Sequence, residues 1–199
     1  MRRKKTNDIT IVAMFLAVIS VLMVINQVFV TFWPFPIKPT ILQVPVIIAS
    51  LVLGPKLGGI IGAWWGVNSV INSTIITMPL SFVFSPLQPV PGTEYGDIRA
   101  LIVAIVPRIL VGILPYYIYK LFQGKAQKFS LIVVGGFGSI VNTIFVLGAI
   151  YWFFGNVLGW NLQIVLASIV ATNSVAEMIV AAILTMMIAP TLMKVYEKR

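Results

Sequence analysis

The sequence of 199 residues contains no cysteine, no histidine and only five acidic residues. Without cysteine the chain forms no disulfide, presents no thiol nucleophile and binds no metal through thiolate. Without histidine it lacks the commonest general base and metal ligand of proteins. The acidic residues are too few and too scattered for a metal cluster: Asp8, Glu94, Asp97, Glu177 and Glu197. We therefore expect that the protein is not an enzyme and holds no cofactor or metal.

Charge of either sign is scarce. Only 10% of the residues are charged and 59% are hydrophobic, whereas about 25% of the residues of a soluble domain are charged. This composition indicates an integral membrane protein. The net charge of +9 raises nucleic acid as a partner, but in a membrane protein an excess of Lys and Arg reflects topology. We expect a lipid bilayer, and no nucleic acid, around this chain.

We expect residues 1–199 to form a single all-α domain with six transmembrane spans. A helix needs about 20 residues to cross a hydrocarbon core of about 30 Å. The six apolar segments are about 9–32, 41–53, 57–75, 99–122, 130–154 and 162–191. The second span is short, and "LGPKLGG" (53–59) joins it to the third through a Gly-Pro turn. Pro55 is suited to the first turn of a helix.

The distribution of Lys and Arg predicts that both termini are cytoplasmic. With the N-terminus inside, eleven of the fourteen basic residues fall on the cytoplasmic side, where membrane proteins carry such an excess. Residues 33–40 and 76–98 are then outer loops. The second is long and half apolar, and we expect its aromatic residues to be buried: Phe82, Phe84 and Tyr95. A lid over an outward-facing pocket fits this loop better than a segment lying on the membrane surface.

Amide and acidic side chains lie within the predicted spans. Asn68 and Asn72 are four residues apart on the third span, and Asn142 lies midway along the fifth. Asn173 and Glu177 share a face of the sixth span. Such residues almost always face the interior of the bundle or a cavity, so all five are candidates for binding a substrate. The alternative is an interhelical hydrogen-bond network that serves only packing.

Arg108 is the most costly of the intramembrane residues. It lies about 13 Å below the outer end of its span, where a cation costs from roughly 3 to more than 10 kcal/mol. It could pair with Glu177 and hold two helices in register, or its planar fork could bind the carboxylate of an anionic ligand. The sequence leaves both explanations open. Pro107 and Pro115 interrupt the same helix and free backbone carbonyls for other partners.

Small residues recur at helical spacing in two spans. Ala13 and Ala17 lie one turn apart on the first span, which allows another helix to approach closely. That helix could belong to a partner or to this chain. Gly58, Gly62 and Gly66 form a similar stripe on the third span. We expect this glycine stripe to pack against another helix of the same chain.

In order and spacing, these segments resemble the substrate-binding S component of an energy-coupling factor (ECF) vitamin transporter. The resemblance covers nearly the whole chain and rests on Ala13-x-x-x-Ala17 and on four longer segments. These are "VPVIIASLVLGPKLGGIIGAWWG", "SFVFSP", "VPRILVGILPYYIYK" and "TNSVAEMIVAAIL". It implies a substrate-capture subunit that crosses the bacterial plasma membrane several times and binds a water-soluble vitamin. It also implies partners, namely a transmembrane T component, which would contact Ala13 and Ala17, and two cytoplasmic ATPases. The sequence has no G-x-x-x-x-G-K-[ST] phosphate loop of its own.

Within that family, "SFVFSP" and "VPRIL" look most like the pantothenate-type members. Pantothenate carries a carboxylate, an amide and hydroxyls, which suit Arg108 with Asn142 and Asn173. Aromatic side chains near the expected pocket could instead stack on a planar ring, and these are Trp33, Phe82 and Phe84.

Three groups of alternatives therefore stay open. Inside the family, the vitamin could be hydroxymethylpyrimidine or pyridoxine, riboflavin, or folate. Outside it, a stand-alone secondary transporter would need an ion-coupled site, for which Glu177 is the solitary intramembrane acid. A structural membrane protein is the third alternative, and it does not explain a lidded interior lined by polar residues.

Overall fold

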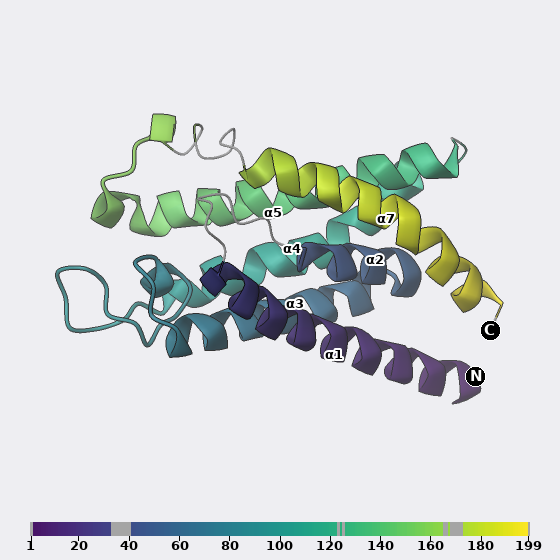
Figure 1. Ribbon diagram of the computed structural model, residues 1–199, viewed down its shortest axis with the longest axis horizontal. Coiled ribbons are helices and arrows are strands. Elements are labelled where there is room, and N and C mark those ends of the chain that lie inside the picture. Colours follow the sequence, from purple (N-terminus) through teal and green to yellow (C-terminus); the bar gives the residue numbers. More distant parts are fainter. Residues whose placement is uncertain are drawn as a thin grey trace.

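The computed structural model describes residues 2–32, 41–122, 124, 126–164, 167 and 173–198. Over these residues every regular element is a helix. The elements are α1 (Arg2–Phe32), α2 (Gln43–Leu53), α3 (Pro55–Ile75), the 3-10 helix η1 (Ser81–Val83), α4 (Arg99–Leu121), α5 (Gln127–Leu158) and α7 (Asn173–Glu197). They form an elongated bundle with the 76–98 loop at one end, the loop end, and both described chain ends near the other (Figure 1).

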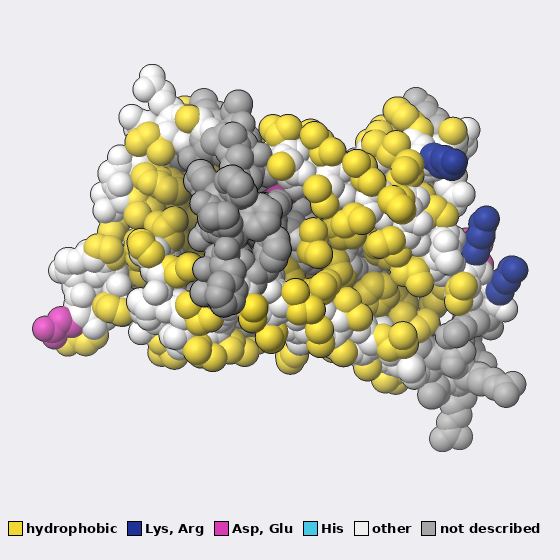
Figure 2. All heavy atoms as spheres, in the orientation of Figure 1, with side chains coloured by type: hydrophobic (Ala, Val, Ile, Leu, Met, Phe, Trp, Pro, Cys, Tyr) yellow, Lys and Arg dark blue, Asp and Glu magenta, His cyan; other side chains and the backbone are white. Residues whose placement is uncertain are grey.

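Four of the described helices are long and apolar enough to cross a membrane: Asp8–Val28, Arg99–Leu121, Gln127–Leu158 and Ser174–Glu197. Helix α2 is apolar but has only 11 residues. Helix α3 has 21 residues, but the amides and hydroxyls in its second half lower its hydropathy. The face seen in Figure 2 is mostly hydrophobic, and its Lys and Arg side chains gather at the end that carries the C-terminus. The surface is that of a membrane protein.

The helix bounds agree with the predicted segments for α2, α3 and α4 and differ from them for α1, α5 and α7, while the six membrane crossings stay a prediction. Helices α2, α3 and α4 begin and end within two residues of the predicted segments. Helix α1 begins at Arg2 rather than near residue 9, α5 covers Gln127–Leu158 rather than about 130–154, and α7 continues to Glu197 rather than ending near residue 191. Near the end of α7, the Tyr196 hydroxyl donates a 2.9 Å hydrogen bond to Asp8 of α1. Part of 162–172 lies outside the described residues.

A sharp turn joins α2 to α3. Gly54 has φ of +85°, a left-handed conformation that favours glycine. Its N–H donates to the carbonyl of Ser50 at 3.1 Å, and Pro55 follows as the first residue of α3. The expected Gly-Pro turn is confirmed.

The glycine stripe of α3 packs against α4. A Cβ on Gly58 would lie 2.2 Å from the carbonyl oxygen of Gly112, and one on Gly62 would lie 2.1 Å from that of Arg108. On Gly66 it would lie 2.8 Å from the Ile105 Cα. No side chain fits at such distances, so the two backbones touch along three turns. The expectation of packing within the chain is confirmed, and this contact sets the position of Arg108 relative to α3.

Candidate functional site

Arg108 is buried on α4, with 8% of its surface exposed. Its Nη1 donates a 3.0 Å hydrogen bond to the carbonyl of Val103, one turn earlier. The guanidinium carbon lies 5.3 Å from the ring centroid of Trp65 and 5.3 Å from that of Phe84. Desolvated contacts of this kind contribute about 2 kcal/mol. Among the described residues its Nε has no hydrogen-bond partner, so this buried cation keeps one N–H for an acceptor.

Each aromatic neighbour of Arg108 comes from a different part of the chain. Trp65 belongs to α3, and the glycine stripe brings that helix close to α4. Phe84 directly follows η1 in the 76–98 loop. Phe84 thus brings the loop onto the cation, and its role in binding a substrate stays a prediction.

The 76–98 loop is tied to the end of α3 by side-chain hydrogen bonds. The hydroxyls of Thr74 and Ser85 lie 2.7 Å apart. The Gln88 Nε2 donates to the carbonyl of Thr74 at 2.9 Å and to the hydroxyl of Thr77 at 3.2 Å. The Ser81 hydroxyl accepts from the N–H of Met78 at 2.9 Å. These bonds hold the first half of the loop, residues 76–88, in one conformation over the bundle.

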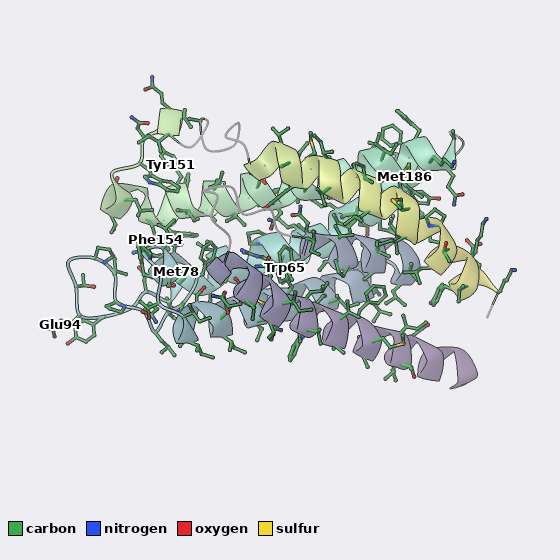
Figure 3. The ribbon with its side chains drawn as sticks, viewed as in Figure 1. Trp65, Met78, Glu94, Tyr151, Phe154 and Met186 are labelled. Atoms are coloured by element: carbon green, nitrogen blue, oxygen red, sulfur yellow. The ribbon has the colours of Figure 1, made fainter. Side chains whose placement is uncertain are left out.

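Only part of the 76–98 loop is buried. The lid interpretation therefore applies to the buried part alone. Phe82 is buried, and its ring meets that of Phe154 edge to face with centroids 5.6 Å apart. Tyr95 is 78% exposed, so the expectation that it is buried is wrong. It lies in a tight turn in which its carbonyl accepts from the N–H of Val90. Figure 3 shows Glu94 of this turn projecting away from the helices, whereas Phe154 and Met78 lie closer to the bundle.

Arg99 and Asp97 form an exposed ion pair where the loop enters α4. The Arg99 Nε donates to an Asp97 carboxylate oxygen at 2.8 Å, and the Asp97 carboxylate also accepts the Arg99 backbone N–H at 2.8 Å. The Arg99 guanidinium holds the pKa of the Asp97 carboxyl below its ordinary value. The pairing of Arg108 with Glu177, one of the two explanations that the sequence leaves open, stays untested. Glu177 lies half-buried near the start of α7.

The predicted asparagines differ in their surroundings. Asn142 of α5 has a buried Oδ1 without a hydrogen-bond partner among the described residues. Asn68 donates to the carbonyl of Trp64 in its own helix at 2.9 Å. Asn72 donates to Gln27 of α1 at 3.2 Å. The bonds of Asn68 and Asn72 are those expected of the packing alternative.

Two predicted residues fall outside what the structure describes. Asn173 begins α7, but its side chain is not described, and Trp33 lies in the undescribed segment 33–40. Their roles stay predictions.

Sequence reasoning missed Gln43. This side chain is fully buried in the first turn of α2, and its Nε2 donates a 2.8 Å hydrogen bond to the buried hydroxyl of Ser139 on α5. Its Oε1 has no hydrogen-bond partner among the described atoms. Gln43 lies near the start of a predicted span, where a polar residue is ordinarily assigned to the membrane interface and not to a binding site. The available signal was that it is the one amide in that short apolar segment.

A groove of about 460 Å³ lies apart from these polar groups, between α1, α2 and α7. Its lining is apolar and includes Met14 and Val18 of α1. Ligand pockets place a few polar groups against an apolar wall, and neither Arg108 nor Asn142 lines this groove. We therefore place the candidate site at Arg108. Ala13 and Ala17, on the same helix as Met14 and Val18, are exposed.

A sequence model described as "ECF transporter, substrate-specific component" matches residues 7–189. The chain belongs to this family. The resemblance of its segments to S components is thereby confirmed, and the protein is a transporter component rather than an enzyme. This S component is 45% identical over 194 residues to the "Pantothenic acid transporter PanT" of Lactococcus lactis subsp. cremoris, covering 98% of this chain and 97% of the relative. It is 28% identical over 182 residues to the "Pantothenate transporter PanT" of Leuconostoc mesenteroides, covering 81% and 78% of the two chains.

Proposed function

We propose that this S component captures pantothenate for import. The observation that carries the proposal is the 45% identity, over nearly the whole chain, to a protein named as a pantothenic acid transporter. Arg108 supplies the chemical reason. A water-soluble acid needs a buried cation to replace its hydration, and Arg binds carboxylates in a two-pronged geometry.

The surroundings of Arg108 support binding at the edge of its guanidinium. Trp65 and Phe84 lie 5.3 Å from the guanidinium carbon and favour the charged form without neutralising it. Val103 accepts from only one of the terminal nitrogens. A carboxylate would complete the partners of this cation, and Phe84 would cover it from the 76–98 loop.

We infer that the chain crosses the bacterial plasma membrane six times with both termini in the cytoplasm. Eleven of the fourteen basic residues lie on the cytoplasmic side in that orientation, as topology rules require. The loop end then faces the outside of the cell, where the vitamin arrives. Arg108 then lies in the outer half of α4 and Asn142 midway along α5, and the 76–98 loop acts as a lid over them.

The energy for import would come from a T component and two ATPases. The sequence contains no phosphate-binding loop, so partners must couple nucleotide hydrolysis to release of the vitamin. Ala13 and Ala17 are exposed on α1, as a face that receives a partner helix must be. Small residues four apart permit close helix contact, and we assign this face to the T component.

Native mass spectrometry of the purified protein tests the proposal. The protein would be expressed in cells supplied with pantothenate, pyridoxine, hydroxymethylpyrimidine, riboflavin and folate together. We expect pantothenate to be the vitamin that remains bound when detergent is removed in the gas phase. Retention of one of the other four, with no pantothenate, would refute the assignment. Co-purification of a T component and two ATPases tests the partnership separately.

A further inference from the structure

Five buried side-chain atoms have no hydrogen-bond partner among the described residues, and they belong to Gln43, Ser50, Arg108, Asn142 and Thr185. Three of them lie in the halves of neighbouring helices nearer the loop end or at mid-helix: Oε1 of Gln43 on α2, Nε of Arg108 on α4 and Oδ1 of Asn142 on α5. Native proteins rarely leave buried polar atoms unpaired, because the lost hydration is not replaced. Two of the atoms are carbonyl acceptors and the third is a cationic donor.

Helices α2, α4 and α5 meet at a contact made by Ile47, Pro115 and Gly138. A Cβ on Gly138 would lie 2.6 Å from the Ile47 Cδ1 and 3.6 Å from the Pro115 Cγ. The three helices therefore share one point in the bundle, and residues four or seven positions away along each helix lie on the same faces.

The three polar residues lie on these faces, on the same side of the contact. Gln43 is four residues from it along α2, Arg108 is seven along α4 and Asn142 is four along α5, in each case toward the loop end. The hydrogen bond from Gln43 to Ser139 shows directly that the Gln43 side chain reaches α5 at this level. Gln43, Arg108 and Asn142 therefore start from positions about one to two helical turns from the contact toward the loop end, whereas Ser50 lies on the other side of it.

We propose that Gln43 is a specificity-determining residue of the vitamin site. Its Oε1 accepts a hydrogen bond from a hydroxyl or amide N–H of the substrate, while Ser139 holds its amide nitrogen and so sets the direction of the oxygen. The inference rests on the proposed function, that the cargo is pantothenate. Pantothenate carries one carboxylate for Arg108, and its hydroxyls and amide N–H are donors for the acceptors of Gln43 and Asn142.

This arrangement would discriminate against substrates that leave the buried Gln43 Oε1 without a hydrogen-bond donor. A site built to accept a hydrogen bond rejects an analogue that lacks the donor, because the buried acceptor then keeps no partner. Gln43 therefore selects for the donor-bearing part of the molecule, whereas Arg108 selects for the acid.

The test measures the affinity of the purified full-length protein for three ligands. They are pantothenate, an analogue with both hydroxyls replaced by hydrogen, and an analogue with an ester in place of the amide. Gln43→Met keeps the volume of the side chain and removes its hydrogen bonds. We expect it to bind pantothenate about tenfold more weakly, corresponding to ~1.4 kcal/mol. One of the two analogues lacks the group that donates a hydrogen bond to the Gln43 Oε1. For that analogue, the affinities of wild type and Gln43→Met should differ by less than about threefold.

Thr185→Val is the matched control. It removes another buried hydroxyl without a described partner, on α7 where that helix faces Gly135 of α5, and should leave all three affinities unchanged. If Gln43→Met loses the same factor of affinity for all three ligands, Gln43 only supports the fold and the proposal is overturned. An unchanged affinity for pantothenate would also overturn it.

Two further measurements separate the possible failures. If Gln43→Met does not reach a folded state, as judged by its melting temperature, Ser139→Ala carries the test. We expect Ser139→Ala to weaken pantothenate binding and to show the same dependence on the missing donor, and a uniform effect would again overturn the proposal. Failure of the proposed function looks different, because the wild-type protein itself would then bind neither pantothenate nor its analogues.

Discussion

Replacement of Arg108 by lysine tests the role of the buried cation most closely. Lysine keeps the positive charge but cannot form the two-pronged contact with a carboxylate. It also loses the planar group that lies 5.3 Å from the rings of Trp65 and Phe84. A single charge-assisted hydrogen bond contributes about 1.5–3 kcal/mol. We therefore expect Arg108→Lys to bind pantothenate at least about tenfold more weakly, since ~1.4 kcal/mol corresponds to a factor of ten.

Titration calorimetry of the purified variants gives the affinities. Arg108→Gln, which removes the charge, should bind more weakly than Arg108→Lys. An analogue with the carboxylate reduced to an alcohol should bind wild type, Arg108→Lys and Arg108→Gln with similar affinity. If the variants lose as much affinity for the alcohol as for pantothenate, the guanidinium does not contact the carboxylate and the reasoning is wrong.

The ion-pair alternative predicts another pattern. If Arg108 pairs with Glu177, Arg108→Gln leaves a carboxylate without its partner in a medium of low dielectric constant, and the yield of folded protein falls. A second substitution, Glu177→Gln, would then restore both yield and affinity. If Arg108 binds the ligand, the double variant should remain as weak as Arg108→Gln.

Further predictions concern packing, docking and the lid. Gly62→Val should lower the melting temperature, because its Cβ would lie 2.1 Å from a carbonyl oxygen of α4 and overpacking costs about 1–3 kcal/mol. Gly148→Ala is the control, since nothing lies within 4 Å of a Cβ at that position. An unchanged melting temperature for Gly62→Val would contradict the close packing of α3 against α4. Ala13→Trp with Ala17→Trp should leave pantothenate binding by the isolated protein intact and abolish uptake into cells, whereas lost binding with normal complex assembly would return the pair to internal packing. Phe84→Ala should raise the dissociation rate of the ligand more than it lowers the association rate, as measured by stopped flow. Replacing 89–95 by a short linker should change neither rate, because this segment is largely exposed and a Cβ on Gly96 would lie 3.0 Å from the carbonyl oxygen of Gln88, so the flanking residues already lie close together. An unchanged residence time in Phe84→Ala would exclude the lid role.

The sequence predicts those features that depend on local pattern. Hydropathy and the Gly-Pro turn place α2, α3 and α4 within two residues of their bounds. Spacing alone identifies the glycine stripe, because only close backbone contact explains small residues repeated every turn. The cost of a cation in hydrocarbon predicts that a lone arginine in an apolar run is buried, as Arg108 is, but it leaves open whether an acid of the chain or a ligand pairs with it.

The remaining features depend on contacts between distant parts of the chain. The extension of α7 to Glu197 accompanies the hydrogen bond from Tyr196 to Asp8, 188 residues away. The partner of Gln43 is 96 residues away, so no local pattern reveals it. Exposure of Tyr95 follows from a turn in which the backbone, not the ring, makes the contacts. Hydropathy could not separate Asn142, whose Oδ1 is unpaired, from Asn72, which bonds to α1.

Recognition of the pantothenate carboxylate by Arg108 can be measured by calorimetric titration of the wild-type protein, purified without its partners in a lipid nanodisc. We expect saturable one-to-one binding of pantothenate. The analogue whose carboxylate is reduced to an alcohol should bind at least tenfold more weakly, the factor that corresponds to a loss of ~1.4 kcal/mol at Arg108. Binding of the alcohol as tight as that of pantothenate would contradict recognition of the acid by Arg108. Absence of any binding of pantothenate, by a protein that melts cooperatively, would contradict the assignment of the vitamin itself.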